Sequence, residues 1–167
     1  MLEVIIAILI ITAFLTGTLQ LMAVDALYRV RAKRQAQANF WIQEDFEDVK
    51  YLASTLDVTS SPNYISPDVC TNINQGYATA LRRQLTDTAL PTTPIPQEKL
   101  VEIKPIVGKN YSLFRTFNIT SANPHRLRID YQVQLATGQI ADDYQNQENV
   151  IAKSSVEVIP DASFQCP

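Results

Sequence analysis

The sequence predicts an α+β fold, in which a very long N-terminal helix packs by its second half on a small antiparallel sheet of three or four strands. Two observations lead to this prediction. A helical pattern runs without a firm breaker from about Leu2 to about Leu56, and several later segments alternate apolar and polar residues. The chain thus divides into an apolar half-helix (residues 1–24), an amphipathic half-helix (residues 25–56) and a globular head (residues 57–167).

The apolar half-helix has the properties of a membrane span. It contains no charged residue from Val4 to Val24, and a span requires about 20 apolar residues. Proline is absent from it, and Gly17 is its only weak point for a helix. No stop signal follows Val24, and the first firm breakers lie at residues 60–62. The two half-helices are therefore expected to form one continuous helix.

Glu3 at the start of the apolar run needs an explanation. A carboxylate in an apolar layer is costly unless it is paired or protonated. The first basic side chain downstream, Arg29, is too far along the helix to reach it. We therefore expect the partner of Glu3 to lie outside this chain. The alternative is that Glu3 lies at the membrane interface and complements the helix dipole.

The amphipathic half-helix carries one apolar stripe, with residues recurring at spacings of four, three, four and three: Ile42, Phe46, Val49, Ala53 and Leu56. We expect this stripe to pack on the head of the same chain. The charged residues of the region, Asp45 among them, lie largely off the stripe. Phe40 and Trp41 fall partly off it, and we expect them to contact neighbouring copies of the chain.

The head combines one short helix with the alternating segments. Residues 74–90 predict the helix, with Tyr77, Leu81 and Leu85 on one face, and a proline-rich surface connection follows. Residues 111–119, 127–135 and 150–159 predict strands. In the first of these, Arg115 shares a face with Leu113 and Phe117. The simplest arrangement is an antiparallel sheet with one face on the helix stripe and the other in solvent.

Composition and motifs exclude several classes of function. A net charge of −3 argues against nucleic acid as a partner. The single His125 gives neither a zinc cluster nor a catalytic triad. Asp142, Asp143 and Glu148 do not match a calcium loop, so a solvated acidic loop is the better interpretation. We therefore expect no metal, no cofactor and no catalytic residue.

The two cysteines, Cys70 and Cys166, are far apart and form no CxxC motif. Because a membrane anchor suggests a head outside the cytosol, we expect them to form a disulfide. The alternative is two separate reduced thiols. The basic run from Arg29 to Arg34 would instead hold the head in the cytoplasm under the positive-inside rule. A basic leader upstream of Met1 would remove this conflict, and we expect one in the precursor.

The segment "MLEVIIAILIITAFLTGTLQLMAV" resembles the N-terminus of type IV pilins and type II secretion pseudopilins. The match consists of an apolar residue before Glu3, Val4 and Ile5 after it, and an unbroken apolar helix. The long helix leading into a sheet and the C-terminal cysteine also match that family's ladle-shaped architecture. Two features depart from it. Only two residues precede Glu3, and the apolar half has no proline, which makes the chain more similar to minor pilins and pseudopilins.

The resemblance implies a structural subunit of a pilus or pseudopilus, with no enzymatic activity. Glu3 would face the positive N-terminus of an adjacent subunit. The implied partners are other pilin subunits, a prepilin peptidase and the pilus assembly machinery. The chain would first span the inner membrane once with its head in the periplasm, and would then enter a surface pilus or periplasmic pseudopilus. The alternative is a monomeric, membrane-tethered binding module or adhesin, and a third option is an anchored enzyme.

Overall fold

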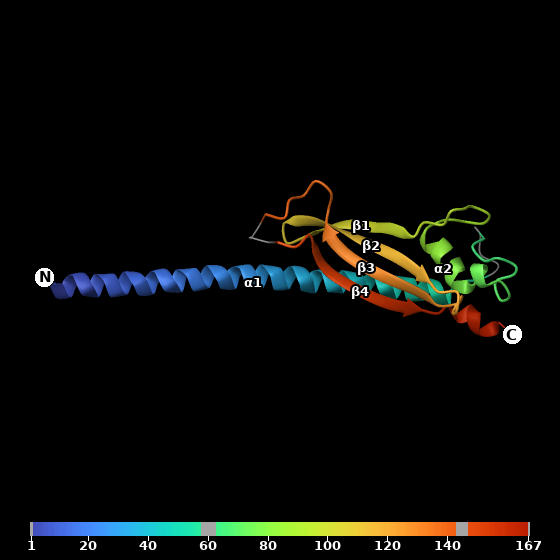
Figure 1. Cartoon of the computed structure of the whole chain (residues 1–167), viewed down its shortest axis with the longest axis horizontal. Coiled ribbons are helices and arrows are strands. Elements are labelled where there is room, and N and C mark those ends of the chain that lie inside the picture. The colour runs from blue at the N-terminus through green and yellow to red at the C-terminus, as the bar shows by residue number, and fades with distance from the viewer. Residues whose placement is uncertain (1, 58–62, 143–146, 167) are drawn as a thin grey trace.

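A computed structural model describes residues 2–57, 63–142 and 147–166 of the protein. Its longest element is α1 (Leu2–Ser54), one uninterrupted helix of 53 residues whose first half projects away from the head (Figure 1). At ~1.5 Å per residue this helix is about 80 Å long. The predicted end near Leu56 agrees with the observed end within the usual uncertainty of helix boundaries. The breakers predicted at residues 60–62 lie outside the described residues.

The head contains a four-stranded antiparallel sheet with the order β1-β2-β3-β4. Its strands are β1 (Glu98–Ile106), β2 (Lys109–Ile119), β3 (Leu127–Leu135) and β4 (Val150–Val158). A long helix joined to this sheet confirms the α+β prediction. Strands β2, β3 and β4 coincide with the three predicted segments, and β1 is an additional edge strand.

Strand β1 is irregular, which explains why the sequence analysis did not predict it. A bulge interrupts the pairing with β2 between Leu100 and Glu102, and Pro105 lies near the end of the strand. Bulges, prolines and lysines are typical of exposed edge strands, where they prevent pairing with other chains. The turn to β2 places Val107 and Gly108 at φ values of 43° and 82°, as a two-residue type I′ hairpin requires.

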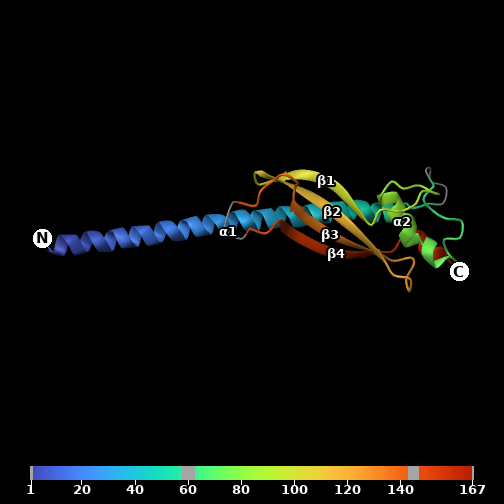
Figure 2. The ribbon, with the colours of Figure 1, turned by 45° about the horizontal axis from the view of Figure 1, so that its top comes forward.

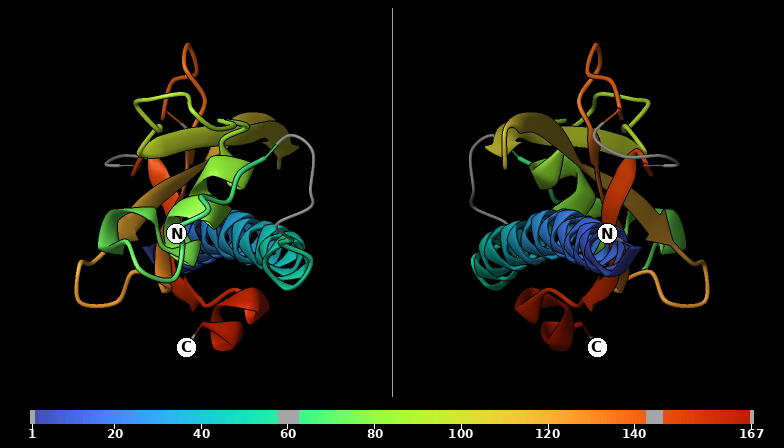
Figure 3. Two further views of the ribbon diagram at one scale, coloured as in Figure 1. Left: turned by 90° about the vertical axis from the view of Figure 1, so that its right-hand side faces the viewer. Right: turned by 90° about the vertical axis from the view of Figure 1, so that its left-hand side faces the viewer.

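The sheet covers the second half of α1, as Figure 2 shows and as the end-on views in Figure 3 make clear. From the helix stripe, Ile42, Val49, Ala53 and Leu56 are buried, and Phe46 packs partly buried against the core. They meet apolar side chains from β2 and β3, including Leu113, Phe117, Ile129 and Val133. The packing of the predicted stripe on the chain's own head is confirmed.

The buried face of α1 is wider than predicted. It begins at Arg34 and Ala38 and includes Trp41, which is only 5% exposed. The expectation that Trp41 contacts a neighbouring copy is therefore wrong, because the sheet already covers it within the chain. Phe40, one residue earlier, is 68% exposed. A stripe of more than ~100° on a core-facing helix readily includes position 41.

Asp45 is also buried, contrary to the prediction that it lies off the stripe. Its two carboxylate oxygens accept hydrogen bonds from Arg115 on β2, at 2.8 Å from Nε and 2.5 Å from Nη2. The side chains of Asp45 and Arg115 are 7% and 10% exposed. Burial raises the pKa of the neighbouring Tyr131, and the charge of Asp45 raises it further. A bidentate ion pair thus ties α1 to the sheet inside the core.

The end of the head far from the N-terminus holds α2 (Tyr77–Leu85) and two short 3-10 helices, η1 (Ile73–Gln75) and η2 (Asp161–Gln165) (Figure 1). The predicted face of α2, with Tyr77, Leu81 and Leu85, is buried. The Cys70–Cys166 disulfide is formed, with a Cα–Cα distance of 5.3 Å. It joins the loop after α1 to the C-terminus, as predicted.

Candidate functional site

The most exposed apolar surface of the protein is the first half of α1. Of the described residues, α1 alone forms a helix long and apolar enough to cross a membrane, and none of its most apolar window is buried. Phe14 and Leu21, for example, are 72% and 71% exposed. An apolar surface this large and continuous is typical of a segment that lies in a membrane or against other proteins.

The polar side chains within this half-helix are largely satisfied by the helix itself. The Thr12 hydroxyl donates to the Ile8 carbonyl at 2.9 Å, that of Thr16 to Thr12 at 2.6 Å, and that of Thr18 to Leu15 at 2.9 Å. Such bonds to the preceding turn allow threonine to lie in an apolar environment without an unpaired hydroxyl. The half-helix is therefore compatible with lipid or with neighbouring helices over almost its whole length.

Glu3 is the charged exception, and Gln20 is a second polar side chain that is exposed. It lies in the first turn of α1 and is exposed. Within the part of the chain that the structure describes, no cation pairs with it. Arg29 lies about 40 Å further along the helix, at ~1.5 Å per residue, and pairs with Asp25 at 2.8 Å. Among the described residues, the fold thus brings no positive side chain within reach of Glu3.

The basic run after the apolar half splits into two environments. Arg29, Arg31 and Lys33 are exposed, whereas Arg34 is only 5% exposed. The Arg34 guanidinium donates to the carbonyl of Val107 at 3.1 Å and so anchors the β1–β2 turn against α1. In the sequence Arg34 looks like one of four equivalent flanking charges. The signal that could have distinguished Arg34 is its spacing, four residues before Ala38 and eight before Ile42, which continues the helix stripe toward the N-terminus.

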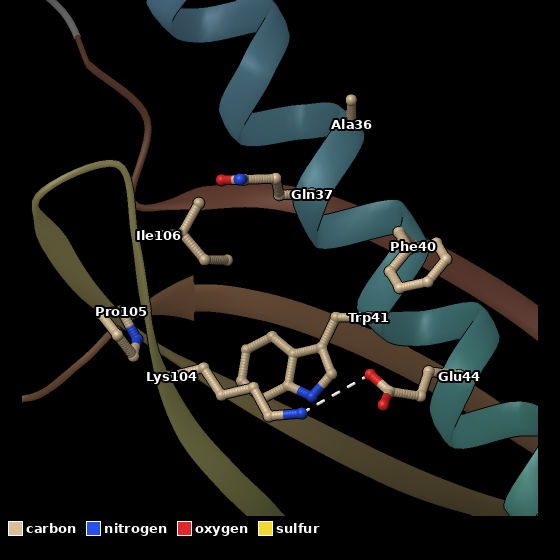
Figure 4. Close-up of a pocket in the computed structure, with 8 residues that line it drawn as sticks. All are labelled: Ala36, Gln37, Phe40, Trp41, Glu44, Lys104, Pro105 and Ile106. Carbon is tan, nitrogen blue, oxygen red and sulfur yellow. Dashed lines mark ion pairs between the residues drawn. The ribbon is translucent and has the colours of Figure 1, made fainter.

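A shallow groove of about 400 Å³ lies between α1 and β1, as the close-up in Figure 4 shows. The Lys104 ammonium lies over the Trp41 ring, 5.3 Å from its centre, and pairs with Glu102 at 3.2 Å and Glu44 at 3.6 Å. Burial favours the neutral amine, but the hydrogen bond to Glu102 and the two carboxylate charges outweigh it and raise the pKa of Lys104. The one cation of the groove is therefore already paired.

The other residues that the sequence raised have structural roles. His125 accepts a hydrogen bond through Nδ1 from the backbone N–H of Tyr77 at 3.3 Å, at the start of α2. Asp142 pairs with Lys109 at 2.6 Å, and Asp143 lies outside the described residues. Among residues 2–57, 63–142 and 147–166, no group of three His, Cys, Asp or Glu side chains is placed to hold a metal ion.

No model of a known protein family, no curated protein and no solved structure matches this chain. The candidate site is the exposed first half of α1 together with Glu3. Its geometry and charge are the grounds for choosing it.

Proposed function

We propose that this protein is a structural subunit of a helical filament, of the type IV pilus or type II secretion pseudopilus kind. The observation that carries the proposal is the division of α1. The second half of this single helix is covered by the chain's own sheet, and its first half is covered by nothing in the described part of the chain. A filament of bundled helices would cover the first half, whereas the head would face outward.

The physical argument rests on the cost of the exposed apolar surface. Each Å² of apolar surface in water costs roughly 25 cal/mol. A projecting helix of this length therefore needs either lipid or neighbouring copies around it. In the proposed life cycle the helix is surrounded first by lipid and then by neighbouring copies. The helix spans the inner membrane once, with the head in the periplasm, and is then transferred by an assembly machinery into the filament.

Glu3 gives the proposal its specific content. In lipid or in a helix bundle its charge needs a partner, and the described part of the chain offers none within reach. The positive N-terminus of an adjacent subunit would supply one, and this pairing would fix the axial step between subunits. The chain would act through this polymer, with prepilin peptidase as a processing partner and no catalytic activity of its own.

The test replaces Glu3 with Leu, Ala and Asp. Leu and Ala remove a charge from an apolar segment, so membrane insertion should be retained. Incorporation should fall steeply, because the neighbour's ammonium is left buried without a partner, at a cost of several kcal/mol. Asp keeps the charge with a shorter reach and should give an intermediate result. The measurement is the ratio of sheared filament to membrane-bound subunit at equal total subunit.

Gln20→Leu is the matched control, because it also replaces an exposed polar side chain of the same half-helix with Leu. It should leave the ratio unchanged. Normal incorporation of Glu3→Leu would contradict the assembly role of Glu3. Wild-type protein that stays monomeric in the membrane would favour the alternative, a tethered binding module or adhesin.

A further inference from the structure

A group of basic side chains follows the apolar half of α1 directly. We call Arg29, Arg31 and Lys33 the basic collar, and all three are exposed. Arg29 pairs with Asp25 at 2.8 Å, and because this pair lies at the surface it contributes little and can exchange partners. In the part of the chain that the structure describes, no carboxylate forms an ion pair with Arg31 or Lys33. The collar can therefore accept an anionic partner from outside the chain.

The position of the collar along α1 matches the headgroup layer of a membrane. The uncharged residues from Val4 to Val24 span ~31 Å at ~1.5 Å per residue, close to the ~30 Å of a hydrocarbon core. Arg29 then lies ~7.5 Å and Lys33 ~13.5 Å beyond the core, where the headgroup layer is about 5–8 Å thick. Side chains on a helix tilt toward its N-terminus, so these long side chains reach back toward the membrane and its phosphate groups.

The cations of the collar surround the helix and do not form a single face. Arg29 and Lys33 are four residues apart and share one side of α1, whereas Arg31, two residues from each, points away from both. Arg31 comes three residues before the buried Arg34 and so lies on the side where the head begins. Lipid surrounds a membrane helix on every side, whereas a single protein partner contacts one side. The arrangement of the collar therefore favours lipid.

Tyr28, beside the collar, has the character of a residue at a membrane interface. Its ring is 66% exposed, and tyrosine is enriched where hydrocarbon meets water. With Val24, Leu27 and Arg31 it lines a shallow groove along the helix. The surface of α1 thus changes from apolar to aromatic to cationic along the chain, in the order in which a bilayer changes from hydrocarbon to phosphate.

We propose that the basic collar binds the phosphate groups of anionic phospholipids in the membrane leaflet beneath the head. This proposal rests on the membrane stage of the proposed function and not on the formation of a filament. Such a contact holds the helix at one depth in the bilayer until the subunit is extracted. It also gives a role to a basic run that lies on the side of the membrane opposite to the one that the positive-inside rule favours.

Carboxylates near the collar do not cancel its charge. At the end of the head from which the first half of α1 projects (Figure 1), Asp142 is already paired with Lys109 at 2.6 Å. Glu148 lines one small cavity with Arg34 and a residue of the collar. The buried Arg34 itself adds a fourth positive charge next to the collar. Cations therefore outnumber carboxylates at this height, among the described residues, and an anionic surface is attracted.

Electron paramagnetic resonance of the full chain, reconstituted in phosphatidylcholine vesicles, tests the contact. The measured quantity is the fraction of a spin-labelled lipid that is immobilised beside the protein, compared between phosphatidylglycerol and phosphatidylcholine labels. Wild type should favour phosphatidylglycerol about fivefold, which is the effect of one juxtamembrane cation on the lipid that it touches. The preference should weaken in 1 M salt, where the Debye length falls to ~3 Å. It should drop below about twofold in the collar variant, Arg29→Gln/Arg31→Gln/Lys33→Gln.

The matched control removes the same charge from the head, with Lys50→Gln, Lys99→Gln and Lys153→Gln together. Lys50 and Lys99 form surface pairs with Glu47 and Asp87, and Lys153 is exposed on β4. This variant should retain the wild-type preference. Emission from the buried Trp41 checks that the head of each variant is folded.

The outcomes separate this proposal from the proposed function. A wild-type preference below about twofold, or one that the collar variant retains, would overturn the lipid contact. If wild type showed no preference and the collar variant entered filaments poorly, the collar would bind carboxylates of neighbouring copies instead of lipid. A clear preference in a protein that forms no filament would leave the lipid contact standing and overturn the filament. A chain that failed to insert into vesicles would overturn both.

Discussion

Removal of one partner from the Asp45–Arg115 pair should destabilise the head more than any surface substitution. The pair is bidentate and nearly fully buried, with both oxygens of Asp45 used by one guanidinium. Asp45→Leu leaves the Arg115 cation in the core without a counter-charge, and Arg115→Met leaves the carboxylate. Breaking a buried pair in this way costs about 3–5 kcal/mol of unfolding free energy.

The double variant Asp45→Leu/Arg115→Met tests whether the two charges are coupled. It removes both charges and fills the space with apolar side chains of similar length. Replacing a whole buried pair with apolar groups is often neutral or stabilising. We therefore expect the double variant to recover most of the loss, within about 1–2 kcal/mol of wild type. Lys50→Met, which breaks the exposed pair with Glu47, should change stability by less than about 1 kcal/mol.

Trp41 provides the assay. It is the only tryptophan of the chain, it lies on α1 one turn before Asp45, and it is 5% exposed. Denaturant unfolding of the full chain in detergent, followed by tryptophan emission, reports loss of the helix–sheet contact. If either single variant unfolded at the same denaturant concentration as Lys50→Met, the pair would not tie α1 to the sheet. Additive losses in the double variant would equally refute a coupled pair.

Three further predictions concern the far end of the head and the sheet. Replacing Cys70 and Cys166 with Ser opens a loop with a sequence separation of 96, which should cost about 4–5 kcal/mol by the chain-entropy model; denaturation of wild type with and without reductant should give the same difference. Gly76→Ala should destabilise by about 1–3 kcal/mol, because its Cβ would lie 2.2 Å from the Pro124 carbonyl oxygen, whereas Gly17→Ala, with open space around it, should be neutral or stabilising. The pKa of Asp130 is held below its usual value by hydrogen bonds from Ser155, Arg128 and Asn118, so its contribution is complete above the ordinary pKa of Asp and is lost as the pH falls through the folded pKa. Asp130→Asn should therefore reduce the acid-induced loss of stability, measured by unfolding at pH 3 and pH 6.

The elements that the sequence predicted well are those with a strong and local pattern. The helix from Leu2 carries a long apolar run without a breaker and then an amphipathic stripe, and the strands around Leu113, Ile129 and Val156 alternate apolar and polar residues. Strand β1 lacks such a pattern, because it is an edge strand whose side chains are mostly exposed and whose pairing is interrupted by a bulge. Its existence depends on β2, with which it pairs, and so could not be predicted from its own residues.

The buried Asp45–Arg115 pair was not predicted, for a different reason. Asp45 looks like one more carboxylate in an acidic stretch, and only Arg115 on the apolar face of its strand indicated that a counter-charge was needed inside. Helix and strand are 70 residues apart in sequence at this contact. Among the four neighbouring carboxylates, helical spacing places only Asp45 beside the stripe, three residues after Ile42 and four before Val49, but it does not specify that a charged side chain there turns inward. The width of the buried face, which also takes in Trp41, is likewise fixed by the sheet and not by the helix.

Polar residues would direct the assembly of a helix as apolar as this one. Lipid chains and neighbouring helices are similarly apolar, so moving the first half of α1 from a membrane into a helix bundle gains little hydrophobic free energy. Close packing and the few polar contacts must then determine where each copy stops. Glu3 is the charged group of this apolar half, and because no cation pairs with it within the described residues, it has a partner to gain from a neighbour. In the proposed filament, Glu3 sets the step between adjacent copies. Loss of this contact should therefore leave the protein folded and inserted in the membrane, but unable to hold its position in the polymer.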